Sequence, residues 1–203
     1  ALVLNLDDPV VSGYGADATA PVVGYRIGEP PAGGIGMVDG WIHARGVRPL
    51  VGDSDTDGPI LPTAELGVPG RHNVSNAMAA IAAGLLFGVP TEAIRRAATS
   101  FKGVEHRLET VATIDGIRYV NDSQGTQPDA VVAAIRAFDP PIVLIADGRS
   151  KDVDLAALGP VVAEQAAAAV LIGESASDLE RLFGRSGLRR VERAETLESA
   201  VDR

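Results

Sequence analysis

A pair of side-chain amides opens the first clearly helical stretch of the sequence. Asn73 and Asn76 lie three residues apart, so on a helix they project about 60° from one another and away from the apolar side marked by Val74 and Met78. An amide carries both a donor and an acceptor, which suits the edge of a purine ring. The same spacing also allows one asparagine to cap the helix while the other faces solvent.

Arg107 is the next residue that could bind an anion. It lies in the run Glu105-His106-Arg107-Leu108-Glu109, where its guanidinium could fork onto a phosphate or ribose oxygen. A salt bridge from Arg107 to Glu105 or Glu109 fits the same residues equally well. The histidines of the chain are scattered without metal-ligand spacing, so we expect no transition-metal site held by protein side chains.

The densest polar run is Asn121–Pro128, directly after a predicted strand. Asp122 could accept a hydrogen bond from a ribose hydroxyl or orient the water of a cation, and Ser123 or Thr126 could bind a carboxylate. The alternative is a loop that leads into a helix, with Thr126 or Asp129 as the cap.

Lys151 follows the next predicted strand, in Gly148-Arg149-Ser150-Lys151-Asp152. The chain has only one other lysine, Lys102, so a lysine at the end of a strand is unusual for this composition. Its ammonium could hold an anionic substrate, although a solvated loop lysine is an equal alternative.

Common catalytic motifs are missing from the sequence. It contains no Gly-x-x-x-x-Gly-Lys-Ser/Thr phosphate loop, no Gly-x-Gly-x-x-Gly after a strand and no Gly-x-Ser-x-Gly elbow. We therefore assign no catalytic residue and expect an incomplete catalytic apparatus.

The pattern of strands and helices changes near residue 104. We therefore expect residues 1–104 and 105–203 to form separate domains, which position these side chains. The first part predicts a small antiparallel ribbon of short strands at 22–27, 36–44 and 48–51, with a turn cluster at 53–59. Helical periodicity begins at Arg71 and ends at Gly88, and a second helix follows from about Thr91.

The second part alternates strands and helices, as in an open parallel sheet of the doubly wound α/β class. We expect its polar loops at 121–128, 147–152 and 173–175 to share one rim, because ligands bind beyond the carboxyl ends of such strands. The predicted strands are 117–120, 142–146 and 168–172, and the predicted helices are 129–137, 155–167 and 177–183.

The composition limits the kind of protein. The chain has 203 residues, 46% of them hydrophobic and 22% charged, and a formal net charge of −9. These values indicate a globular protein with the wrong charge for nucleic acid or an anionic membrane. The lack of cysteine and of a long apolar run favours a cytoplasmic protein. A strand-like start at Ala1 and an uncapped helical end predict a fragment of a longer chain.

Several stretches together resemble the Mur ligase family, in its order and spacing over essentially the whole chain. They are Leu4–Pro9, Gly70–Ala77, Phe101–Gly103 with His106–Glu109, Tyr119–Ser123 and Gly148–Asp152. The resemblance implies a cytoplasmic three-domain amide ligase that uses ATP and Mg²⁺, with most of their ligands outside these residues. It would join D-glutamate to UDP-N-acetylmuramoyl-L-alanine through an acyl phosphate in peptidoglycan synthesis.

By this resemblance, residues 1–104 are the C-terminal half of the central ATP-binding domain and residues 105–203 are a truncated, Rossmann-like C-terminal domain. The complete protein would be a monomer, and this piece alone would not turn over. Closure of the C-terminal domain onto the central one would bring their contacts together.

The resemblance also implies roles for particular side chains. Asn73 and Asn76 match adenine contacts, and Arg107 and Asp122 match contacts to the ribose or phosphates. The residues implied to hold D-glutamate are Thr126 and Lys151, with Ser123 as a further candidate substrate contact.

The sequence departs from the family motif Asn-Asp-Ser-Lys-Ala-Thr-Asn. It has Gln124, Gly125 and Gln127 at the variable positions, so a neutral amide replaces a positive charge near the substrate. Another Mur ligase, a folylpolyglutamate synthase or a nucleotide-binding module without catalysis therefore stays open as an alternative.

Overall fold

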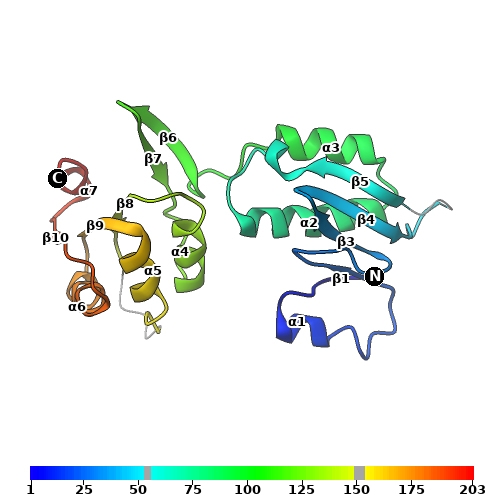
Figure 1. Cartoon of the computed structure of the whole chain (residues 1–203), viewed down its shortest axis with the longest axis horizontal. Helices are drawn as coiled ribbons and strands as arrows, with labels where there is room; N and C mark the ends of the chain where they lie inside the picture. The colour runs from blue at the N-terminus through cyan, green and yellow to red at the C-terminus, as the bar shows by residue number, and fades with distance from the viewer. Residues whose placement is uncertain (53–55, 149–153) are drawn as a thin grey trace. The chain divides into compact units, whose positions relative to one another are not determined.

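The computed structural model describes residues 1–52, 56–148 and 154–203. The chain divides into two compact units, which we call unit 1 (Ala1–Gly103) and unit 2 (Val104–Arg203). The boundary expected from the sequence, between residues 104 and 105, lies one residue further along. Figure 1 shows the order of the elements along the chain.

Unit 1 is built on a five-stranded mixed sheet in the order β1-β2-β3-β4-β5, in which β1, β2 and β3 run parallel and β3, β4 and β5 antiparallel. Its strands are β1 (Leu2–Asn5), β2 (Val22–Tyr25), β3 (Gly34–Val38), β4 (Trp41–Val47) and β5 (Thr56–Pro62). Its helices are α1 (Pro9–Gly13), the 3₁₀ turn Thr63–Glu65, α2 (Arg71–Leu86) and α3 (Thr91–Ser100).

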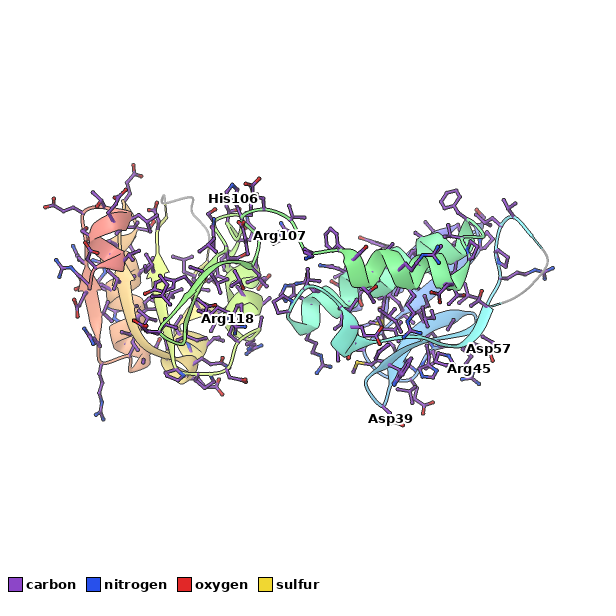
Figure 2. The ribbon with its side chains drawn as sticks, turned by 90° about the horizontal axis from the view of Figure 1, so that it is seen from above. Asp39, Arg45, Asp57, His106, Arg107 and Arg118 are labelled. Atoms are coloured by element: carbon purple, nitrogen blue, oxygen red, sulfur yellow. The ribbon has the colours of Figure 1, made fainter. Side chains whose placement is uncertain are left out.

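The predicted antiparallel pairing is confirmed for β3, β4 and β5, but it is wrong for β2, which pairs parallel with β1 and β3, and part of the predicted boundaries differ. The expected strand 36–44 is a hairpin of β3 and β4, since Asp39 (φ 49°) and Gly40 (φ 77°) both take the left-handed conformation of a tight turn. Asp39 is labelled at the tip of this turn in Figure 2. The first strands are parallel because the segment between β1 and β2 includes α1 and is long enough for a crossover.

The last strand of unit 1 also lies elsewhere than predicted. Residues 48–51 form no strand, and β5 instead occupies residues that were expected to be a turn cluster. The acidic residues of this segment led us to expect a turn, but Asp57 lies within the strand and does not end it. Asp57 Oδ1 accepts a hydrogen bond of 2.9 Å from the backbone N–H of Gly46 in the neighbouring strand.

The core of unit 1 forms where α2 packs on the sheet, and the predicted helix is confirmed. The helix begins after Gly70, whose φ of 97° favours glycine, and its apolar residues recur every three or four positions. They pack against side chains from β3, β4 and β5. The fully buried residues of this core include Met78, Ile81, Ala82, Ile35, Ile42, Val47 and Leu61.

Unit 2 contains a parallel three-stranded sheet in the order β10-β9-β8 and a separate hairpin of β6 and β7, drawn in green in Figure 1. The strands are β6 (Glu109–Ile114), β7 (Ile117–Asn121), β8 (Ile142–Ala146), β9 (Ala166–Leu171) and β10 (Val191–Arg193). The helices are α4 (Pro128–Ile135), α5 (Leu158–Gln165), α6 (Ala176–Ser186) and α7 (Leu197–Val201).

The α/β class is confirmed, with one strand wrongly placed. The predicted strand 117–120 is β7, which pairs antiparallel with β6 rather than joining the parallel sheet. The cause is a tight turn at Asp115 and Gly116, which have φ values of 51° and 81° and bring Ile114 opposite Ile117. The short strand β10 was not predicted.

Helices α4, α5 and α6 supply the side chains that pack on one face of the parallel sheet. Side chains of β9 alternate, so Ala169 and Leu171 join the core under α5 and α6, while Ala168 and Val170 are buried toward the other face. Helix α7 also contacts β8, but Val143 of that strand is 64% exposed. Within the described parts of the chain, no helix combines the length and apolar character needed to cross a bilayer.

Candidate functional site

The clearest sign of a functional site is a strained turn around Arg107. His106 and Leu108 on either side of it have φ values of 64° and 46°. A residue other than glycine in this region costs about 1–3 kcal/mol and persists only where its surroundings hold it. We call His106–Leu108 the Arg107 turn; Figure 2 labels His106 and Arg107 on it. Leu108 is buried, whereas Arg107 is exposed.

His106 is held by two residues that face each other across the β6–β7 hairpin. Glu109 and Asn121 are paired in the register of the two strands. Glu109 Oε2 accepts a hydrogen bond of 2.8 Å from the His106 backbone N–H, and the Asn121 amide nitrogen lies 2.9 Å from His106 Nδ1. Asn121 Oδ1 accepts from the Ser123 backbone N–H at 3.1 Å, which orients the amide so that its nitrogen faces the ring.

This orientation selects a tautomer of the His106 ring. An amide NH₂ group is only a donor, so His106 Nδ1 is the acceptor of the bond from Asn121. The matching tautomer of the neutral ring carries its proton on Nε2.

Asp122 and the loop after β7 hold the rest of the turn. Asp122 Oδ1 accepts a hydrogen bond of 3.0 Å from the Leu108 backbone N–H, and the Gln124 backbone N–H donates to the His106 carbonyl at 3.1 Å. A Cβ at Gly125 would lie 2.5 Å from Asp122 Oδ2, so glycine lets this carboxylate fold over the loop. The strain of the Arg107 turn is thus offset by bonds from several directions.

The guanidinium of Arg107 is left available for an anion. The salt bridge to Glu105 or Glu109 that the sequence also allowed is not formed, and Arg107 makes no ion pair within residues 1–52, 56–148 and 154–203. Glu109 is instead engaged by His106. An exposed guanidinium on a braced turn is suited to bidentate contact with a phosphate.

Asn73 and Asn76 lie side by side at the start of α2, as their spacing predicts. Asn76 Nδ2 and Asn73 Oδ1 are 3.5 Å apart, and Asn73 Nδ2 donates to the Pro69 carbonyl at 2.6 Å. The capping alternative is wrong, because Gly70 precedes the helix and no side chain caps it. Asn76 is exposed and presents its amide to solvent.

The hydroxyls of Ser123 and Thr126 lie on the loop before α4, and both residues are exposed. Gln127 precedes α4 and no side chain caps this helix, so the prediction that Thr126 or Asp129 is a cap is wrong. Lys151 lies outside the described residues.

The expected meeting of polar loops is confirmed for the loops after β8 and β9, whereas the loop at 121–128 does not extend from a strand of the parallel sheet. That loop follows the separate hairpin. The Ser175 backbone N–H donates to the Gly148 carbonyl at 3.0 Å, and a Cβ at Gly173 would lie 2.0 Å from Asp147 Oδ1.

The sequence did not reveal Glu109 and Asn121 as supports of the turn. Recognising Asp115-Gly116 as a hairpin turn would have placed the two residues opposite each other. Nothing in the sequence signals the left-handed conformation of Leu108, since a bulky side chain disfavours it.

Comparison with known proteins gives relatives over nearly the whole chain. Residues 106–203 match the family model described as "Mur ligase, glutamate ligase domain". UDP-N-acetylmuramoylalanine–D-glutamate ligase from Salinibacter ruber is 40% identical over 205 residues, covering 98% of this chain and 43% of the relative. The ligase of the same name from Symbiobacterium thermophilum is 39% identical over 189 residues, covering 92% of this chain and 40% of the relative. The chain thus spans about two fifths of the length of these relatives.

Solved structures agree in fold at lower sequence identity. Folylpolyglutamate synthase from Mycobacterium tuberculosis superposes with a TM-score of 0.66 at 18% identity, covering 95% of this chain and 44% of that chain. UDP-N-acetylmuramate-alanine ligase from Thermotoga maritima superposes with a TM-score of 0.63 at 16% identity, covering 87% of this chain and 43% of that chain. These structures establish a common fold, and together with the sequence relatives they lead to one conclusion: the chain belongs to the Mur ligase family.

Proposed function

We propose that this chain is part of an ATP-dependent amide ligase that adds D-glutamate to UDP-N-acetylmuramoyl-L-alanine in peptidoglycan synthesis. The names of its relatives support the substrates. The observation that carries the proposal is the Arg107 turn, where two left-handed residues and several hydrogen bonds present an exposed guanidinium.

The proposed reaction has two steps. A carboxylate oxygen of the L-alanine end attacks the γ-phosphorus of ATP, which gives an acyl phosphate and releases ADP. The amine of D-glutamate then attacks the carbonyl carbon, phosphate leaves with the former carboxylate oxygen, and the nitrogen loses a proton. Such chemistry depends mainly on positioning and on stabilising phosphate charge.

The residues of this chain fit the nucleotide. Arg107 supplies a cation without a carboxylate partner among the described residues, which suits a phosphate group of ATP. Asn76 presents an exposed amide beside that of Asn73, a pairing suited to adenine. Asp122 has its second oxygen, Oδ2, for a ribose hydroxyl, since Oδ1 accepts the bond from the Leu108 backbone N–H.

Mg²⁺ would be the metal of such a ligase. The described residues contain no group of three or more His, Cys, Asp or Glu side chains that could bind a metal ion. In this proposal, as the family resemblance implies, most of the Mg²⁺ ligands belong to other parts of the complete protein.

D-Glutamate would be held by the loop after β7 and by Lys151. Ser123 and Thr126 are exposed and carry hydroxyls that donate to a carboxylate. Gln124 offers an amide where the family motif has a lysine, so Lys151 would supply the positive charge for the acidic substrate.

In this proposal residues 1–104 are the C-terminal half of the central ATP-binding domain, and residues 105–203 belong to the C-terminal domain. The match of the chain to about two fifths of each relative supports this assignment. The complete protein would act in the cytoplasm as a monomer, and these 203 residues alone would not turn over.

A change at Asn76 tests the adenine contact. We expect Asn76→Ala in the full-length protein to raise the KM for ATP about tenfold, the value of one to two hydrogen bonds, without changing the melting temperature. Steady-state kinetics at varied ATP would measure this, and an unchanged KM would remove Asn76 from the nucleotide site. Ser75→Ala, next to it on α2, is the control.

A change at Lys151 tests the substrate contact. We expect Lys151→Ala to raise the KM for D-glutamate about tenfold or more, because a charge-assisted bond to a carboxylate is lost, while the KM for ATP stays the same. Kinetics with each substrate varied in turn would separate the two effects. The other lysine of the chain, Lys102, gives the matched control Lys102→Ala; a shift in the KM for ATP alone would contradict the assignment.

The function itself is tested by supplying the full-length protein with ATP and a panel of acceptors. Release of ADP should require both UDP-N-acetylmuramoyl-L-alanine and D-glutamate. Preference for another amino acid or precursor would indicate a different Mur ligase, and preference for a folate would indicate a folylpolyglutamate synthase. ATP binding without turnover on any acceptor would favour a nucleotide-binding module.

A further inference from the structure

We propose that Glu109 and Asn121 are positioning residues that hold the His106 ring and backbone so that Arg107 points at the nucleotide. This inference rests on the proposed function, since it gives the Arg107 turn a purpose. Neither residue is assigned a ligand; Glu109 acts on the backbone of His106 and Asn121 on its ring.

The first support is the arrangement of the two residues on the hairpin. Glu109 begins β6 and Asn121 ends β7, and they are directly paired in the register. Side chains of paired residues on an antiparallel hairpin lie close together on one face. His106 is therefore held by two residues of paired strands, in addition to the bonds from the loop after β7, which favours precise placement of the guanidinium.

The second support is that each bond acts on a different part of His106. Glu109 Oε2 takes up the His106 backbone N–H at 2.8 Å, and the Asn121 amide bonds Nδ1 of its ring at 2.9 Å. With φ at 64°, His106 needs such restraints to stay in the left-handed region. Loss of either restraint frees the residue before Arg107 to return to a commoner conformation, which redirects the guanidinium.

The third support is the chemistry of Asn121. Its oxygen accepts from the Ser123 N–H, so its nitrogen is the group that meets His106. An aspartate would keep the oxygen and replace the donor by a second acceptor. Asn121→Asp should therefore move the ring proton from Nε2 to Nδ1. If Asn121 only filled space beside the ring, the same substitution would leave the proton where it is.

The kinetic test is a double-mutant cycle in the full-length protein. Glu109→Ala and Asn121→Ala should each raise the KM for ATP about tenfold, and Glu109→Ala should leave the KM for D-glutamate unchanged. In the Arg107→Ala background each should add less than about twofold, because the residue through which they act is gone. Glu109→Gln keeps an oxygen that can accept the bond from the His106 N–H, so its KM for ATP should match that of the wild type. This variant keeps the test decisive if Glu109→Ala folds poorly. Glu105→Ala, a change at a nearby exposed carboxylate, is the control.

The spectroscopic test uses ¹⁵N NMR of the histidine rings in the full-length protein near pH 8. The wild-type His106 ring should carry its proton on Nε2, and Asn121→Asp should move it to Nδ1. A wild-type ring protonated on Nδ1 would overturn the inference, whatever the protein does with ATP.

The outcomes separate this inference from the proposed function. If the wild-type protein uses no ATP, or Arg107→Ala leaves its KM unchanged, the proposed nucleotide site fails and the inference fails with it. If Arg107→Ala raises the KM but Glu109→Ala and Asn121→Ala do not, or if their effects persist in full without Arg107, only the inference fails.

Discussion

Replacing Arg107 with alanine in the full-length protein is expected to raise the KM for ATP about a hundredfold, as a forked, charge-assisted contact to a phosphate would require. The backbone of the turn is held by Glu109, Asn121 and Asp122 rather than by the arginine side chain. The variant should therefore fold normally, and steady-state kinetics at varied ATP would report the lost contact directly.

Two further variants make this result specific. Arg107→Lys keeps the charge but loses the fork, so it should recover only part of the ATP affinity. Arg189→Ala removes another exposed arginine of unit 2 that forms no ion pair among the described residues, and it should leave the KM for ATP unchanged. Equal effects of Arg107→Ala and Arg189→Ala would mean that general charge, not the turn, attracts the nucleotide.

The largest expected effect on stability is that of Phe183→Ala. Phe183 lies on α6 with 1% of its surface exposed and is the largest fully buried side chain of the unit 2 core. Truncating a buried phenylalanine costs about 3–5 kcal/mol, because apolar contact is lost and a cavity remains. Chemical denaturation followed by circular dichroism should show the free energy of unfolding of unit 2 reduced by this amount.

Phe87→Ala is the matched control, since it removes the same side chain where 75% of its surface is exposed. We expect a change in the free energy of unfolding below about 1 kcal/mol for it, as for most surface substitutions. A loss of similar size in both variants, or a loss below about 1 kcal/mol for Phe183→Ala, would contradict the packing described for unit 2.

The parts of the fold that could be predicted are those governed by local periodicity. The apolar spacing of Met78, Ile81 and Leu85 gave α2, and the continuous apolar runs gave β8 and β9. The pairing of strands was harder, because it depends on turns. The tight turns at Asp39-Gly40 and Asp115-Gly116 form two hairpins that the sequence prediction does not contain. Without the second turn, β7 was predicted to lie in the parallel sheet.

The sequence singled out candidate site residues but not their arrangement. Residue type and position singled out Arg107 and Asp122, because charged and polar groups near strand ends are candidates for ligand binding. The bond from the Leu108 N–H to Asp122 joins residues 14 positions apart, and its existence depends on the left-handed backbone at Leu108. A conformation that opposes the local preference of its residue arises from tertiary contacts, so the sequence pattern does not report it.

The central claim is that the protein activates a carboxylate with ATP, and isotope transfer tests it most directly. The full-length protein would be given ATP, D-glutamate and UDP-N-acetylmuramoyl-L-alanine carrying ¹⁸O in its free carboxylate, and the released phosphate would be analysed by mass spectrometry. The account predicts one ¹⁸O atom in the phosphate for each amide formed. Phosphate without ¹⁸O, with its new oxygen taken from water, would contradict it.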